Sequence, residues 1–209
     1  GLISNTSLMM GVAGAAVDPK ITLLSGVAGW LAGAFSMAVG EYVSVRSQRE
    51  LFEGQIALEK EELEKYPEEE AEELALIYAA RGLSKDDALK LGRAMVADPI
   101  RGLDVLAREE LGLNPDELGS PWGAAISSFV FFSFGALVPL IPFALAPGPA
   151  APVATLTLAG LALFALGGTS SLFTGKRFLW GALRVLLLGA LSSGLTYSIG
   201  KLLGVGILT

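Results

Sequence analysis

Apolar residues run along this chain in long stretches that contain few or no charges. Four stretches, at residues 21–43, 122–146, 153–173 and 178–199, are long enough to cross a bilayer as helices. Residues 1–16 form a fifth, shorter candidate. The pattern predicts an all-α, polytopic membrane protein with five transmembrane helices.

A polar segment separates the second stretch from the third, and its turn residues predict a series of helices. The second span is expected to continue as one helix to about Lys65, because Pro67 follows. Further helices are expected at 68–81, which Gly82 ends, at about 84–97, and at 100–111. Asn114-Pro115 and Ser120-Pro121 each resemble an N-cap followed by proline at the first helical position.

These elements predict three parts: residues 1–45 with transmembrane helices 1 and 2, residues 46–119 as a helical insert, and residues 120–209 with transmembrane helices 3 to 5. Basic residues that flank spans indicate orientation, because such residues concentrate on the cytoplasmic side. Lys176, Arg177, Arg46 and Arg49 all fall on the insert's side. The insert is therefore expected to be cytoplasmic, in the cell membrane of a prokaryote or the vacuolar membrane of a eukaryote.

Composition and charge support a membrane protein and narrow its chemistry. Hydrophobic residues make up 52% of the chain and charged residues only 17%, while 19 of the 21 acidic residues lie between Glu50 and Glu117. The chain has no cysteine and no histidine, which excludes disulfides and thiolate or imidazole metal sites. Any metal must be bound by oxygen or by methionine sulfur. Nothing in the sequence indicates nucleic-acid binding.

Glutamates in the insert are spaced as metal ligands. Glu59 and Glu62 lie three residues apart on the long helix, Glu70 and Glu73 lie three apart on the next, and the turn at Pro67 lets the two pairs face each other. With Glu110 they could enclose divalent cations such as Mn²⁺, Fe²⁺, Ca²⁺ or Mg²⁺. A solvated acidic helix face would explain the same run of glutamates without any metal.

The second span carries two candidates for an ion path. Met37 lies one turn before Glu41, and a carboxylate inside a membrane helix is costly enough to suggest a functional role. The alternative is an interfacial Glu41 that pairs with Arg46 or is exposed to headgroup water. Gly26, Gly29 and Gly33 on this helix allow close helix approach, either within the chain or across a dimer. Pro139 and Pro142 are expected to break the third span and free backbone carbonyls.

Several segments together resemble the vacuolar iron transporter family, in its bacterial or archaeal type. They are GLISN at residues 1–5, GVAGA at 11–15, SMAVGEYVSVRSQ at 36–48, REELGL at 108–113 and GALVPLIP at 135–142. The resemblance covers essentially the whole chain. It implies a homodimeric transporter that exports cytosolic Fe²⁺, and also Mn²⁺, in exchange for protons.

The resemblance also implies roles for particular residues. Glu59, Glu62, Glu70, Glu73 and Glu110 correspond to the metal ligands of the insert, and Met37 and Glu41 correspond to the transport pathway. Fe²⁺ and Mn²⁺ would be bound as substrate, and no cofactor or enzymatic activity is expected. A membrane-anchored metal buffer or sensor is the alternative.

The chain departs from the family pattern at two places. The family's first span has an Asp that would precede Gly1, so this chain is expected to be truncated at its N-terminus. Where some members carry two methionines beside the last insert glutamate, this chain has Leu106 and Ala107. The insert site is therefore expected to offer only oxygen ligands, which weakens any preference for Fe²⁺ over other divalent ions.

Overall fold

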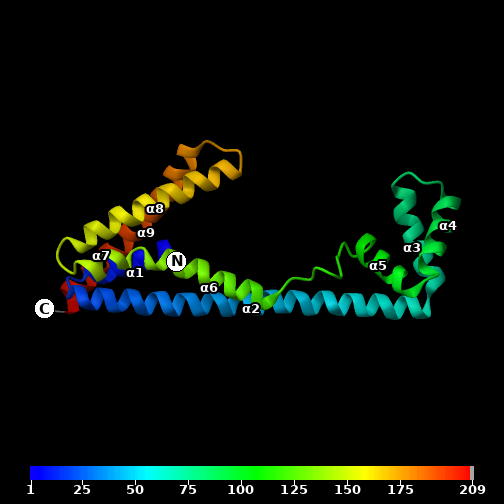
Figure 1. Cartoon of the computed structure of the whole chain (residues 1–209), viewed down its shortest axis with the longest axis horizontal. Helices are drawn as coiled ribbons and strands as arrows, with labels where there is room; N and C mark the ends of the chain where they lie inside the picture. Colours follow the sequence, from blue (N-terminus) through cyan, green and yellow to red (C-terminus); the bar gives the residue numbers. More distant parts are fainter. Residues whose placement is uncertain (208–209) are drawn as a thin grey trace. The chain divides into compact units, whose positions relative to one another are not determined.

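The computed structural model describes residues 1–207, and within that range every regular element is a helix. The chain divides into two compact units, which are described separately (Figure 1). We call residues 1–41 together with the chain from 124 onward the apolar unit, and residues 42–123 the acidic unit. Helix α2 (Pro19–Lys65) contributes residues to both. The predicted all-helical fold class is confirmed for the described residues.

The apolar unit is a bundle built mainly on two long helices. Its elements, besides the first part of α2, are α1 (Leu2–Gly14), α6 (Pro121–Leu137), α7 (Leu140–Leu145), α8 (Ala151–Phe173) and α9 (Phe178–Ile207). Helix α8 packs along α9, and α1 packs against both (Figure 1). Met9 and Met10 of α1 are fully buried beside Leu140 and Phe143, so they serve packing.

Three helices of the described chain are long and apolar enough to cross a membrane. They are α2, α8 and the part of α9 from Phe178 to Gly204. Helix α6 is apolar but shorter, and α1 has 13 residues. The prediction of several membrane-spanning helices is confirmed, and the count of five remains a prediction.

Proline breaks the third apolar stretch at the expected place. Helix α6 ends at Leu137 and α7 begins at Leu140, with Pro139 as its N-cap residue. The buried Thr155 hydroxyl of α8 donates a hydrogen bond of 3.2 Å to the Pro139 carbonyl. A carbonyl that is freed in an apolar setting is costly unless a donor satisfies it, and Thr155 supplies that donor.

The glycines of α2 serve packing within the chain. A Cβ atom at Gly26 would lie 2.7 Å from Met9 Sδ, one at Gly29 would lie 2.3 Å from Leu8 Cδ2, and one at Gly33 would lie 2.2 Å from the Phe132 ring. Each distance is far below van der Waals contact. Close approach between helices of one chain, which the sequence allowed, is therefore observed, and contact across a dimer remains a prediction.

The acidic unit contains the end of α2 followed by α3 (Pro67–Ala80), α4 (Lys85–Val96) and α5 (Pro99–Glu109). Figure 1 shows these three helices gathered near the end of α2 that carries Lys65. The helix boundaries follow local chemistry as predicted. Pro67 opens α3, Gly82 follows it with φ +106°, and the Ser84 hydroxyl accepts a hydrogen bond from the Asp87 amide to cap α4.

One predicted helix start is wrong. Asn114-Pro115 opens a turn rather than a helix: the Asn114 side chain accepts from the Asp116 amide and its carbonyl accepts from the Glu117 amide. The segment then reaches Gly119, whose φ of +85° is not helical. Too few residues lie between Pro115 and Gly119 to repay helix nucleation. Ser120-Pro121 does begin α6 as predicted, because the Ser120 hydroxyl accepts from the Gly123 amide.

Candidate metal centre

A small hydrophobic core fixes the helices of the acidic unit against one another. Its buried members come from all four helices: Leu63 of α2, Ala71 and Leu74 of α3, Val96 of α4 and Leu106 of α5. Gly92 of α4 allows the closest approach, because a Cβ there would lie 2.3 Å from the Ala71 carbonyl oxygen. This core sets the rotation of each helix and therefore the direction of its other side chains.

Three predicted glutamates extend the core-facing stripe of their helices. Glu59 lies four residues before Leu63, Glu70 lies four before Leu74, and Glu110 lies four after Leu106. Residues four apart occupy the same helix face, so each carboxylate projects on the side that the core fixes. The result is a cluster of three carboxylates from α2, α3 and the end of α5, with one oxygen from each lying within 4.8 Å of the others. We call these three residues the glutamate triad.

Two of these carboxylates are buried, and one oxygen of each lacks a hydrogen-bond partner. Glu59 is 4% exposed and Glu70 is 5% exposed, whereas Glu110 closes the triad from the solvent side. Among the described residues, Glu59 Oε1 and Glu70 Oε2 have no hydrogen-bond donor. A buried carboxylate oxygen is stable only with a donor, a shared proton or a cation.

Nearby basic residues do not compensate the triad. Arg93 pairs with Glu68, Arg81 pairs with Glu109 at 2.5 Å, and Arg108 pairs with Asp104 at 2.9 Å. Within residues 1–207 no ion pair involves a member of the triad. The negative charge of the triad is therefore left for a proton or a metal ion.

The pKa values show how strongly the triad attracts a positive charge. Burial, followed by the charges of Glu110 and Glu70, raises the pKa of Glu59 to about 8. Burial also raises the pKa of Glu70, against a hydrogen bond from Glu59 that acts in the other direction. Partial burial and the charges of Glu73 and Glu70 raise the pKa of Glu110 to about 7. At neutral pH the metal-free triad therefore holds protons, which a divalent cation would displace.

Glu62 and Glu73 lie around the triad rather than in it. Glu62 is partly exposed and Glu73 is exposed. Their charges raise the pKa of Glu70, and the charge of Glu73 also raises the pKa of Glu110. All five predicted glutamates thus act on one another, but the structure brings only three of them within bonding reach of one ion.

The two predicted pathway residues lie in the apolar unit. Met37 lines a groove of about 430 Å³ between α1, α2 and α6, together with Ser4, Asn5 and Ser36. Glu41 is exposed and does not line this groove. The alternative partner for Glu41 is otherwise engaged, because Arg46 Nε lies 2.7 Å from Glu50.

Sequence reasoning missed Asn5. Its side chain is 2% exposed, its Nδ2 donates 2.7 Å to the Ala136 carbonyl, and its Oδ1 has no hydrogen-bond donor within the described chain. Asn5 thus brings an oxygen without a hydrogen-bond partner to the groove that Met37 also lines. The signal was available, since the run Ser4-Asn5-Thr6-Ser7 is the polar part of an otherwise apolar first segment.

The whole sequence matches a known family. Residues 1–201 match the sequence model described as VIT family. This chain belongs to the VIT family. Members of this family are transporters and not enzymes, so the chain is an integral membrane transporter.

Relatives in the VIT family share about a third of their residues with this chain. It is 37% identical to a vacuolar iron transporter of Acanthamoeba castellanii over 181 residues, which cover 86% of this chain and 69% of that protein. It is 31% identical to vacuolar iron transporter 1 of Arabidopsis thaliana over 202 residues, 96% of this chain and 81% of that protein. It is 32% identical over its whole length to VIT-like transporter 1b of Glycine max, covering 73% of that protein.

Proposed function

We propose that this transporter moves Fe²⁺ and Mn²⁺ out of the cytosol in exchange for protons. The glutamate triad carries the proposal, because two of its carboxylates are buried, all three lack ion pairs within the described chain, and their oxygens converge within 4.8 Å. The names of the relatives, vacuolar iron transporters, supply iron as the first substrate to test.

The donor set suits a hard or borderline divalent cation. Carboxylate oxygens favour Mn²⁺, Mg²⁺ and Ca²⁺, and they accept Fe²⁺. Leu106 is buried in the core and Ala107 is buried beside it, so no thioether reaches the triad from this part of α5. We therefore expect the acidic unit to bind Mn²⁺ and Fe²⁺ with similar affinity.

Proton exchange follows from the same carboxylates. A cation binds only to deprotonated glutamates, and protonation of Glu59 and Glu110 releases it. We infer that the acidic unit faces the cytosol and captures the metal, and that Met37, Asn5 and Glu41 then carry it through the membrane at the interface of a homodimer. Metal leaving the cytosol is exchanged for protons that enter on the vacated carboxylates.

Flux in proteoliposomes tests this function. Purified protein is reconstituted with a pH gradient, and Mn²⁺ or Fe²⁺ uptake is recorded with an internal metal-sensitive dye and a pH dye. Metal flux that follows the gradient, with matching proton counterflow, is the expected result. Metal uptake without any change in internal pH would contradict proton exchange.

A membrane-anchored metal buffer is the alternative, and Glu41→Gln separates the two functions. A transporter should lose flux in this variant while the acidic unit keeps its metal affinity, whereas a buffer should lose nothing. Glu64→Gln is the matched control, since Glu64 is an exposed residue of α2 outside the triad. It should behave as the unmodified protein in both measurements.

A further inference from the structure

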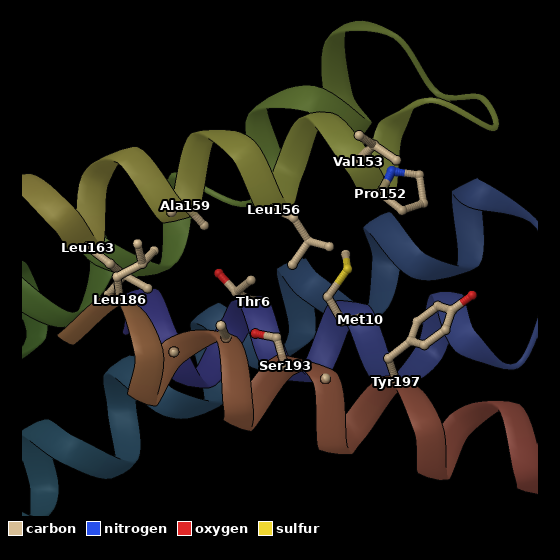
Figure 2. A pocket seen from close by; sticks show the side chains of 14 residues that line it. Thr6, Met10, Pro152, Val153, Leu156, Ala159, Leu163, Leu186, Ser193 and Tyr197 are labelled. Carbon is tan, nitrogen blue, oxygen red and sulfur yellow. The ribbon is translucent and has the colours of Figure 1, made fainter. Parts of the chain in front are cut away.

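A cavity in the apolar unit lies away from the groove that contains Met37. It measures about 490 Å³ and is bounded by α1, α8 and α9. Figure 2 shows Leu163 and Leu186 near one end, Leu156 facing Thr6 and Met10 across the middle, and Tyr197 at the opposite end. Its volume is within the range of small-molecule sites in proteins.

The cavity is built to hold hydrocarbon rather than water. The Thr6 hydroxyl already donates to the Leu2 carbonyl at 2.7 Å, and the Ser193 hydroxyl lies 3.4 Å from the Ser7 hydroxyl. The other lining atoms are mostly carbon, from Leu156, Leu163 and their neighbours. A water molecule needs two to four free polar partners, so this cavity would stay dry.

The surroundings of the cavity identify the class of its occupant. Two of its three walls, α8 and α9, are helices long and apolar enough to span the membrane. Both helices would therefore be surrounded by lipid chains. An acyl chain that moves from lipid into the cavity gains van der Waals contacts with the lining rather than hydrophobic free energy, because lipid is as apolar as the cavity.

A polar, basic group lies at the Tyr197 end. Lys201 follows Tyr197 by four residues on α9 and therefore lies on the same helix face. Both residues also line an adjoining pocket with Ala13 of α1 and Ala16 of the following turn. In the described part of the chain, Lys201 forms no ion pair and the Tyr197 hydroxyl has no hydrogen-bond partner. A phosphate would satisfy both.

We propose that the apolar unit binds one anionic phospholipid, with an acyl chain in this cavity and the phosphate at Lys201 and Tyr197. The lipid would fill the space between α1 and the α8–α9 pair. This site is independent of the metal centre and of the proposed transport function.

Filling the cavity tests the acyl-chain part of the site. A Cβ at Gly194 would meet no atom within 4 Å, so Gly194→Leu places a side chain in the cavity without a backbone clash. Ala165→Leu is the control, because Ala165 is an exposed α8 residue that does not line the cavity. The purified chain, in detergent, is titrated with phosphatidylglycerol and the bound lipid is counted by native mass spectrometry.

The unmodified protein should retain one phosphatidylglycerol, and Gly194→Leu should weaken that binding at least about tenfold, because the leucine side chain would occupy the space of the acyl chain. Ala165→Leu should bind as the unmodified protein does. Equal lipid binding by Gly194→Leu and Ala165→Leu, or no retained lipid on the unmodified protein, would overturn the proposal.

Lys201→Gln tests the headgroup part and does not depend on the folding of the Gly194 variant, since Lys201 is exposed. Affinity for phosphatidylglycerol should fall about fivefold, as expected when one basic residue near an anionic lipid is lost. Affinity for phosphatidylcholine should change less, because that headgroup has no net charge. An unchanged preference for phosphatidylglycerol in Lys201→Gln would refute the assigned phosphate contact.

Discussion

Replacing Glu59 with glutamine should stabilise the metal-free acidic unit while it weakens metal binding. Glu59 is 4% exposed, and burial with the charges of Glu110 and Glu70 raises its pKa from 4.5 to about 8. One pKa unit corresponds to about 1.4 kcal/mol, so holding this carboxylate ionised in the folded state costs on the order of 5 kcal/mol. Glutamine has nearly the same shape and no charge.

The sign of the effect depends on pH. Because the folded-state pKa of Glu59 lies above its value in the unfolded chain, the folded state binds the extra proton. The stability linked to that proton is fully present below about pH 4.5 and is lost as pH rises toward about 8. Near pH 4.5 Glu59→Gln should therefore be less stable than the unmodified protein by the cost of its poorly bonded buried amide, about 1 to 3 kcal/mol. At pH 8 the free energy of unfolding of Glu59→Gln should exceed that of the unmodified protein by about 1 to 3 kcal/mol, after the cost of a poorly bonded buried amide.

Hydrogen exchange is the suitable assay, because it reports the opening of one unit without melting the membrane helices. Protection of α3 and α5 amides is measured in metal-free protein at several pH values, corrected for intrinsic exchange rates. Mn²⁺ affinity is measured by calorimetry on the same samples and should fall at least about tenfold, since a charged ligand is lost. Glu61→Gln is the control, because Glu61 is exposed and pairs with Lys65, so its replacement should leave stability nearly unchanged.

Two results would refute this reasoning. If Glu59→Gln were less protected than the unmodified protein at pH 8, the Glu59 carboxylate would not be a buried, uncompensated charge. If Mn²⁺ affinity were unchanged, the triad would not be the metal site, whatever its electrostatics.

The structure supports three further predictions. Gly92→Ala should destabilise the acidic unit by about 1 to 3 kcal/mol in the same exchange assay, because its Cβ would meet the Ala71 carbonyl at 2.3 Å. The control is Gly54→Ala, whose Cβ would meet nothing within 4 Å and which should be neutral or stabilising. Mn²⁺ affinity of the unmodified protein should rise between pH 6 and pH 8 as Glu110 and Glu59 lose their protons, and a calorimetric titration that shows no pH dependence would contradict this. Asn5→Ala should reduce metal flux in proteoliposomes without changing calorimetric Mn²⁺ binding, since Asn5 lies in the apolar unit, and a loss of both would mean that it acts on folding instead.

Most helix boundaries were predictable because their causes are local. Pro67, Gly82 and Pro121 act on their own backbone and on the adjacent turn, so their effect does not depend on distant residues. Asn114-Pro115 carries the same local signal and failed, because a helix start also needs enough following residues to propagate the helix. Gly119 is not helical and Pro121 begins α6, so too few residues follow Asn114 to form a helix there.

The composition of the triad was harder to predict, because it depends on helix rotation. Spacing alone does not distinguish Glu59 from Glu62, or Glu70 from Glu73, as a member of the triad. The core distinguishes them, since it turns the faces of Leu63, Leu74 and Leu106 inward. A glutamate four residues from the buried leucine of its own helix therefore reaches the triad. This rule can be applied only when the core leucines are known, and packing between helices determines which leucines these are.

The same rule argues that the triad exists to bind a positive charge. Glu59 and Glu70 occupy positions on core-facing stripes, where an apolar side chain would extend the hydrophobic core and avoid buried ionised oxygens. Stability alone would favour leucine or methionine at both positions. The arginines that could neutralise the carboxylates are instead paired with Glu68, Glu109 and Asp104. A solvated acidic face explains neither the burial nor this arrangement of charges, whereas a site that exchanges protons for a divalent cation explains both.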